Sequence, residues 1–368
     1  MKNLFKLAFF NFIVLVGLIV FIELIMRSYY FVSKQTPIAH SVSLQKEWNW
    51  VEASINNKNY RFDPRFVFDE NLGWISAPNQ HYKPENRELV ITNSKSIRDA
   101  REFNKTKTKK RIVVVGDSYS FGFGVSNEET YASQLEQSLK NTEVLNMAVS
   151  AFAKDQAYLM YKNYGKQYNP DIVVMGFYLP DYSRNGFSFR EYLKPAFDID
   201  ENKKFFIKNE KVLTPNELLA LYQSGERKIG GWSYSFFFAF LQQKLDLYKV
   251  YNRNEGAYCR EILAEIMRLY KNEVERSGAT PIWMIIPPNT IYDPEGSKYS
   301  VIGDYAERLA KEMGMPVLNL EQTFLNYKED KNEARRILWR PEEVGSHLSA
   351  EGNKLVAENL AKFISNLD

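Results

Sequence analysis

Ser118 is the residue whose type and position best suit covalent catalysis in this sequence. It follows Gly116 and Asp117, directly after the apolar run at 112–115. In an open α/β sheet, ligands bind outside the carboxyl ends of the strands, where the chain turns into the next helix. A serine hydroxyl at such a turn, beside backbone N–H groups that stabilise an oxyanion, is suited to attack an acyl carbonyl. Gly, Asp and Ser are also ordinary turn residues, so these three residues alone fit a loop equally well.

A serine nucleophile needs a base, and histidine is the side chain that titrates near neutral pH without a large pKa shift. The sequence has three histidines. His40 lies close to an N-terminal apolar segment, and His81 precedes the region in which strands and helices alternate. His347 comes after the last expected strand, just before a helix that Ser349 can cap. A lone loop histidine is more often structural, but this position makes His347 the candidate general base for Ser118.

The elements that would position these two residues follow from hydrophobic periodicity. Short apolar runs predict parallel strands buried on both faces, at 112–115, 144–145, 171–175, 282–286 and 316–320. Apolar residues at helical spacing predict helices, at 131–139, 154–168, 262–274, 299–313 and from 349 onward. Ser126 and Glu129 form a capping-box pattern that places the start of the first helix near Ser126. The alternation predicts one α/β domain with a five-stranded parallel sheet and right-handed crossovers.

Two stretches lack this alternation and set the expected domain boundaries. Residues 36–110 are mixed and polar, and the alternation of strand and helix patterns is again absent at about 182–254. We therefore expect an N-terminal extension at 36–110 and an α/β domain at 111–368 that carries one insertion. Within the insertion, the aromatic-rich stretch at 232–251 is typical of an amphipathic cap helix. Packing of this helix on the α/β core is favoured over a role in lining an acyl or glycan groove or in leaning on a membrane.

Residues 1–35 are expected to form a transmembrane anchor. The segment from Leu7 to Met26 is almost wholly apolar, and about twenty such residues span a bilayer as a helix. No small-x-small cleavage site follows, so a retained signal anchor is favoured over a cleaved signal peptide. The positively charged residues favour a cytoplasmic N-terminus by a narrow margin. The main domain is therefore expected outside the cytoplasm, either periplasmic or extracellular.

The composition excludes several other classes of function. One cysteine cannot form an intrachain disulfide or a zinc site of several thiolates, and three histidines make a His-rich metal site improbable. The 48 Lys+Arg residues against 45 Asp+Glu leave a net charge of +3, too small and diffuse to indicate nucleic-acid binding. Cys259 paired with a histidine would be an alternative nucleophile, but a single buried cysteine is usually inert packing.

Four sequence blocks together resemble the SGNH (GDSL-type) hydrolases and acyltransferases. They are Val115 to Gly122 (VGDSYSFG), Asn146 to Ala151 (NMAVSA), Gly176 to Asp181 (GFYLPD) and His347 to Gly352 (HLSAEG). The resemblance covers roughly residues 85–182 and 255–368, and implies a flavodoxin-like three-layer α/β sandwich. It further implies that Ser118 is the nucleophile, that its N–H contributes to the oxyanion hole, and that His347 is the base. Gly116, Asp117 and Asp181 match structural positions of the motifs.

The sequence departs from the family pattern at three places. Ala151 stands where the family has an oxyanion-hole glycine; its N–H can still donate if the backbone tolerates a Cβ. Pro180 replaces an asparagine, so one oxyanion contribution is missing or comes from elsewhere; losing such a donor costs about 10²–10³ in rate. The acidic residue usually two or three positions before the histidine is also absent. Glu343 or Glu342 is the candidate to orient His347, although both also fit solvated loop charges.

These observations favour a membrane-anchored, extracytoplasmic serine esterase or O-acyltransferase with a Ser-His mechanism that requires no metal or organic cofactor. Its expected substrates are acyl esters, above all O-acetyl groups of cell-surface polysaccharide or another glycan. This carbohydrate preference comes only from what the resemblance implies for anchored family members. The alternative is a degenerate domain of the same fold that binds carbohydrate or an assembly partner without turnover.

Overall fold

The computed structural model describes residues 2–33, 42–57, 62–83, 89–200, 202–227, 235, 237, 241, 253–295, 297–341 and 346–367. The chain forms two compact units. The first consists of Met1–Arg61, Phe189–Leu193 and Leu213–Tyr258, and the second of Phe62–Ser188, Lys194–Val212 and Cys259–Asp368. Ser118 and His347 both belong to the second unit.

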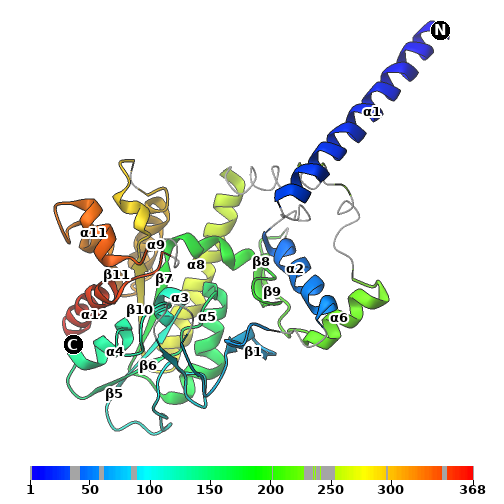
Figure 1. Ribbon diagram of the computed structural model, residues 1–368. Coiled ribbons are helices and arrows are strands. Elements are labelled where there is room, and N and C mark those ends of the chain that lie inside the picture. Colours follow the sequence, from blue (N-terminus) through cyan, green and yellow to red (C-terminus); the bar gives the residue numbers. More distant parts are fainter. Residues whose placement is uncertain are drawn as a thin grey trace. The chain divides into compact units, whose positions relative to one another are not determined.

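The predicted five-stranded parallel sheet is confirmed and lies in the second unit (Figure 1). Its strands are β5 (Lys110–Val115), β6 (Thr142–Asn146), β7 (Ile172–Tyr178), β10 (Thr280–Ile286) and β11 (Val317–Asn319). They are arranged in the order β11-β10-β7-β5-β6. Val113 of β5 is therefore flanked by Leu145 of β6 and Val173 of β7. Because the strand order reverses at β5, a crevice is expected beyond its carboxyl end, where Ser118 follows.

Helices cover both faces of this sheet. On one face, Val114 and Val174 pack in a buried cluster with Leu135 and Leu360, which belong to α4 (Tyr131–Ser138) and α12 (Ala350–Ser365). These two helices lie side by side (Figure 1). On the other face, Tyr270 of α8 (Arg253–Arg276) donates its hydroxyl to the Val173 carbonyl, 2.7 Å away. The result is a three-layer α/β sandwich.

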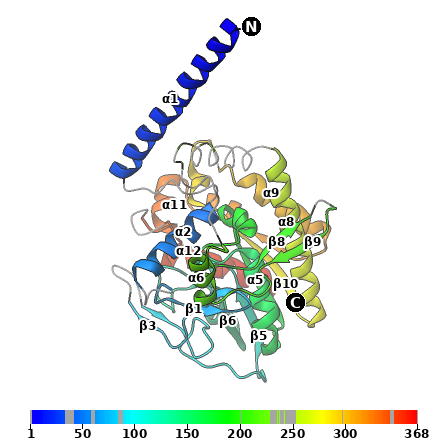
Figure 2. The ribbon, with the colours of Figure 1, turned by 90° about the vertical axis from the view of Figure 1, so that its right-hand side faces the viewer.

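The remaining elements include short helices and three small hairpins. Besides α4, α8 and α12, the described helices of the second unit include α3 (Ser118–Phe121), α5 (Lys154–Met160), α9 (Ser300–Glu312), α10 (Glu321–Leu325) and α11 (Lys331–Leu338). The 3-10 segments are η2 (Lys166–Tyr168), η3 (Leu179–Gly186) and η4 (Asn289–Tyr292). The antiparallel pairs are β1 (Phe66–Asp69) with β2 (Gly73–Ser76), β3 (His81–Tyr82) with β4 (Val90–Ile91), and β8 (Ala196–Ile199) with β9 (Phe205–Lys208). Figure 2 shows the β8–β9 hairpin beside α8, where Lys203 approaches Glu261.

Two local expectations differ from the structure. The helix expected from Ser126 begins at Tyr131, because the Thr130 hydroxyl accepts the Ser133 N–H and so caps the helix. Glu129 does accept the Ser126 N–H, but this bond closes a turn before the helix. The helix expected at 154–168 is α-helical only to Met160 and continues as the π-helix η1 (Tyr161–Gly165) and then η2.

Much of the expected extension belongs to the unit that contains the sheet. Residues 62–110 lie in this second unit, as do residues 194–212 of the expected insertion. Side-chain hydrogen bonds account for the first assignment. Trp74, which is fully buried, donates its indole N–H to the Ser150 carbonyl. Tyr164 donates its hydroxyl to Asp69, 2.6 Å away, and accepts a bond from Asn71.

The first unit contains α1 (Lys2–Ser33), α2 (Val42–Asn56) and α6 (Pro215–Ser224). Within α1, the stretch Phe5–Ser28 has a mean hydropathy of 2.6 and is long and apolar enough to cross a membrane. Glu23 of this stretch accepts hydrogen bonds from the Ser235 hydroxyl and the Phe237 N–H. Most of the aromatic-rich stretch at 232–251 lies outside the described residues.

Buried and half-buried tyrosines should make the second unit less stable at alkaline pH. Burial raises the pKa of Tyr158 and that of Tyr164 to about 12, against about 10 in an unfolded chain. Above pH 10 the unfolded chain therefore loses phenol protons that the folded chain keeps, so stability present below pH 10 is lost as the pH rises toward 12. We expect the thermal midpoint of the detergent-solubilised protein to fall between pH 9 and pH 11. Tyr164→Phe should flatten this fall, and an unchanged slope would contradict the assignment.

Candidate active site

The turn after β5 presents Ser118 at the start of a one-turn helix. Asp117 is the N-cap of α3, and its carboxylate accepts the Tyr119 N–H at 2.9 Å. Ser118 is half-buried, whereas Asp117 is fully buried. Gly116 has no room for a side chain, since a Cβ there would lie 2.3 Å from the Ser120 hydroxyl oxygen. The close approach of this glycine to the helix turns the chain sharply and leaves Ser118 at the carboxyl edge of the sheet.

The opposite end of α3 is held by two side chains that sequence reasoning missed. A helix of four residues has too few internal hydrogen bonds to be stable alone. Arg98 donates to the carbonyls of Phe121 and Gly122 at 2.7 and 2.6 Å, and Asn146 donates to that of Ser120 at 3.0 Å. Burial lowers the pKa of Arg98. A cation at a helix C-terminus is favourable, but nothing in the local sequence around position 98 indicates this contact.

His347 lies against Ser118. Its Nε2 is 2.8 Å from the Ser118 hydroxyl oxygen, within hydrogen-bond distance. The segment that carries the histidine is bonded to the end of α11: the Arg340 N–H donates to the His347 carbonyl, and the Ser349 N–H donates to that of Leu338. Ser349 also caps α12, as predicted, by accepting the Gly352 N–H. A neutral imidazole in this place can accept the hydroxyl proton of Ser118.

Aromatic rings surround the histidine. The rings of Tyr119 and Phe123 both lie 4.8 Å from the imidazole, centroid to centroid. Tyr119 stacks on Tyr178 at 3.6 Å and donates its hydroxyl to the Ser346 carbonyl. Burial raises the pKa of Tyr119 well above its ordinary value, so this phenol stays protonated and keeps that bond. The imidazole is thereby held between rings that restrict its orientation.

The backbone amides of Ser118 and Ala151 occupy the positions at which the resemblance implies oxyanion donors. In the parts of the chain that the structure describes, neither the Ser118 N–H nor the Ala151 N–H donates a hydrogen bond. The loop that carries Ala151 is joined to the nucleophile turn, because the Val149 N–H donates to the Gly116 carbonyl at 3.2 Å. Ala151 has a φ of 68°, in the left-handed region. This position therefore has the backbone conformation of a glycine although its residue carries a Cβ.

Ala151→Gly is expected to stabilise the protein. An L-residue in the left-handed region costs about 1–2 kcal/mol relative to glycine, and the extra freedom of glycine in the unfolded chain offsets part of this gain. We expect the thermal midpoint to rise by about 2 °C, with the Ser118-dependent rate unchanged or higher. Ala151→Val, whose branched side chain tolerates this conformation poorly, should lower the midpoint. A lower midpoint for Ala151→Gly would show that the Cβ makes packing contacts that outweigh the strain.

Pro180, which stands where the family pattern has an asparagine, has no side-chain donor of its own. Asp181 is buried and forms an ion pair with Arg184 inside η3. Asn185 is the first asparagine after β7, but it is 1% exposed and its side-chain oxygen accepts the Lys154 N–H at 2.9 Å. The oxygen of Asn185 thus supports the loop after β6, while its Nδ2 makes no hydrogen bond with any described residue. Besides the backbone amides of Ser118 and Ala151, the Asn185 Nδ2 is therefore a donor without a partner among the described residues.

The structure does not bring the remaining candidate residues, Glu342, Glu343 and Cys259, into contact with Ser118 in the part of the chain that it describes. Glu342 and Glu343, the candidates to orient His347, lie outside the described residues. Cys259 is half-buried on α8, while the imidazole that a thiol nucleophile would need is bonded to Ser118.

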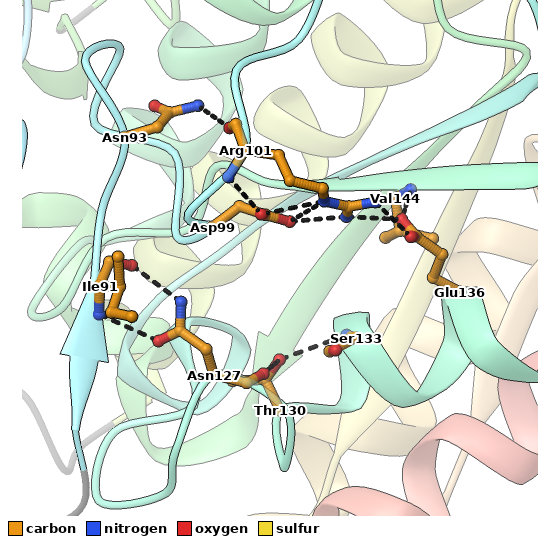
Figure 3. A network of polar contacts seen from close by, with 9 residues as sticks. All are labelled: Ile91, Asn93, Asp99, Arg101, Asn127, Thr130, Ser133, Glu136 and Val144. Atoms are coloured by element: carbon orange, nitrogen blue, oxygen red, sulfur yellow. Dashed lines mark hydrogen bonds and ion pairs between the residues drawn. The ribbon is translucent and has the colours of Figure 1, made fainter.

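A cavity of about 270 Å³ lies at the start of α4, apart from Ser118. Part of its polar lining is paired, as Figure 3 shows. The Asn127 side chain bonds to both the N–H and the carbonyl of Ile91. Arg101 bridges Asp99 and Glu136. These contacts join residues 89–101 to α4 and to the loop before it, and they neutralise Asp99, Arg101 and Glu136 in the cavity lining.

Comparison with known proteins gives a likeness of fold. No family model and no curated protein sequence matches the chain. A putative lipolytic protein of the G-D-S-L family from Desulfitobacterium hafniense is 14% identical, with a TM-score of 0.39 over 69% of this chain and 99% of that one. A member of the same family from Veillonella parvula is 11% identical, with a TM-score of 0.40 over 70% and 98%. A two-domain esterase active on acetylated mannans is 11% identical, with a TM-score of 0.38 over 70% and 49%. The printed names of the first two structures are those of the G-D-S-L lipolytic family, which the four sequence blocks resemble.

Proposed function

We propose that this protein is a serine esterase in which Ser118 is the nucleophile and His347 the general base. The observation that carries the proposal is the 2.8 Å separation between the Ser118 hydroxyl oxygen and His347 Nε2. It joins residues far apart in the chain at the carboxyl end of β5. The free amides of Ser118 and Ala151 add the second requirement of acyl chemistry, donors for an oxyanion.

The reaction proceeds through an acyl-enzyme. Ser118 attacks the carbonyl carbon of the ester while His347 takes its proton, and the two amides stabilise the negative oxygen of the tetrahedral intermediate. The intermediate collapses, the alkoxide leaves with the proton from His347, and the acyl group stays on Ser118. Water then attacks this ester and gives a proton to His347. As the second tetrahedral intermediate collapses, His347 returns that proton to the Ser118 oxygen and the carboxylic acid is released. A sugar hydroxyl in place of water would make the same site an O-acyltransferase.

The proposal extends to the substrate of the enzyme and to its location in the cell. We infer an O-acetylated glycan of the cell surface as substrate, as the resemblance of the sequence blocks to anchored members implies. The apolar stretch Phe5–Ser28 supports single-pass anchoring, and the charge distribution favours a periplasmic or extracellular catalytic unit. No step of this reaction requires a metal ion or organic cofactor.

A covalent probe and a hydrolysis assay test the proposal together. The full chain, purified in detergent, is incubated with a fluorophosphonate, and the modified residue is located by peptide mass spectrometry. Acetate release from p-nitrophenyl acetate and from an acetylated oligosaccharide is measured in parallel. We expect the probe on Ser118 and acetate release that Ser118→Ala loses. Equal acetate release by the two proteins would refute the esterase and favour a domain that binds without turnover.

A further inference from the structure

Two buried ion pairs begin at neighbouring residues of α5. Lys154, the first residue of this helix, pairs with Asp117, and Asp155 pairs with Lys194. In both pairs the side chains are at most 1% exposed. Only the Lys154 pair touches the nucleophile turn. The chain therefore holds two ion pairs of the same chemistry and burial that differ in what they contact.

Asp117 uses its two carboxylate oxygens for two different tasks. Oδ1 accepts the Tyr119 N–H and so caps the helix that begins with Ser118. Oδ2 accepts the ammonium group of Lys154. Lys154 follows Ala151 by three residues, across a loop that ends at the start of α5. The ion pair thus joins the turn that carries one oxyanion donor to the segment that carries the other.

Lys154 is also fixed at its backbone. Its N–H donates to the Asn185 side chain in η3, after β7, and its ammonium lies 5.9 Å from the Phe177 ring of β7. The residue therefore contacts the chain after β5 and after β7, and itself belongs to the segment after β6. These are the three strands around the point where the strand order reverses.

Stability alone does not explain this arrangement. Taking two charges out of water is costly, and apolar residues of similar volume are often as stable or more stable in place of a buried ion pair. A directional link of fixed length is what an apolar pair cannot supply. Oxyanion stabilisation depends on such placement, because a donor acts only when its N–H lies at hydrogen-bond distance from the developing charge.

We propose that Lys154 is a positioning residue that sets the spacing of the two oxyanion donors, the amides of Ser118 and Ala151, through its ion pair with Asp117. The inference rests on the proposed esterase function. It predicts an effect confined to the transition state: losing the link displaces a donor from the oxyanion while the ground-state ester binds as before. A displacement of about 1 Å at a reacting centre costs about 10² in rate.

Lys154→Met in the detergent-solubilised full chain tests this, with p-nitrophenyl acetate as substrate. We expect kcat to fall by about 10²-fold, with KM within a factor of about two. The matched control is Lys194→Met, which breaks the neighbouring ion pair. It should lower the thermal midpoint to a similar extent and leave kcat within a factor of about three. Equal kcat losses in the two variants would overturn the inference, because both would then report a general loss of structure.

A double variant separates positioning from failure to fold. Lys154→Met leaves the Asp117 carboxylate buried without its partner, which is strongly destabilising. Asp117→Asn combined with Lys154→Met removes that charge and keeps a side-chain oxygen to cap α3. We expect the double variant to recover the thermal midpoint but to keep the low kcat. A kcat that returns to the wild-type value would refute the positioning role.

The same experiment distinguishes failure of the underlying function. If wild type and Ser118→Ala release acetate at equal rates, the esterase proposal fails and the positioning role falls with it. If wild type exceeds Ser118→Ala but Lys154→Met matches wild type, only the positioning role fails. The rate of fluorophosphonate modification of Ser118 provides a second readout, since phosphonylation also develops charge on an oxygen next to the serine; Lys154→Met should slow it.

Discussion

Ser118→Ala and His347→Gln are each expected to lower kcat for ester hydrolysis by about 10⁴- to 10⁶-fold. The first removes the atom that forms the acyl-enzyme. The second removes the group 2.8 Å away that takes the serine proton. A serine hydroxyl without a base is a poor nucleophile at neutral pH, so the two losses should be of similar size. The measurement is kcat on p-nitrophenyl acetate, with thermal midpoints to show that the variants fold.

The double variant is the sharper test of the pair. If the two side chains act as one unit, combining the substitutions should cost little more than either alone. His81→Gln is the matched control, since His81 is exposed in β3; it should keep the wild-type rate. Losses that multiply in the double variant would show that Ser118 and His347 act independently, which the proposed mechanism does not allow.

Gly352→Ala is expected to have the second largest effect, on both stability and rate. A Cβ on Gly352 would lie 2.2 Å from the Leu338 carbonyl oxygen, so backbone must move. That carbonyl accepts the Ser349 N–H, and Trp339 beside it forms a bridge with Leu348. Displacing α12 therefore displaces the segment that carries His347. Overpacking of this kind costs about 1–3 kcal/mol, a fall in thermal midpoint of several degrees.

Gly303→Ala is the matched control for this substitution. Gly303 also lies near the start of a helix, but a Cβ there would meet the flexible Leu179 side chain at 3.3 Å. Alanine is favoured over glycine in a helix by about 1 kcal/mol, so this variant should be as stable as wild type or more stable. We expect Gly352→Ala alone to lose activity at a temperature at which both variants remain folded. Equal thermal midpoints would show that α12 accommodates the Cβ without moving.

The strands and the proximity of Ser118 to His347 could be predicted from the sequence because their signals are local. The run at 112–115 is β-branched along its length, as expected for a strand buried on both faces. Ser118 comes shortly after a strand-like segment, and His347 comes shortly before a helix-like segment. Even the unusual backbone at Ala151 could be anticipated, since the resemblance places a glycine there. The α/β class and the parallel sheet followed from the order of these elements, whereas the three-layer sandwich was what the resemblance implied.

The residues that hold the site in place could not be predicted, because their partners are far along the chain. Arg98 caps a helix more than twenty residues away, and its surroundings in the sequence resemble a polar extension. Lys154 looks like an ordinary residue at the start of a helix, and its burial depends on Asp117 and Asn185. The first turn of α4 was misplaced for a related reason. Ser126 and Thr130 are both suitable N-cap residues for this helix. We attribute the start after Thr130 to the packing of Tyr131 in the core.

Because α3 is too short to be stable alone, the proposed reactivity of Ser118 depends on contacts with residues that the ribosome adds before and after this helix. The helix has four residues and is held by Arg98, which is synthesised before it, and by Asn146 and Lys154, which follow. Its partner His347 is synthesised 229 residues later. A growing chain that has completed the nucleophile turn therefore still lacks the base and the helix α12 that fixes it. Ester reactivity at Ser118 would then mark the finished fold, and a probe that labels this serine would count completed molecules rather than chains in progress.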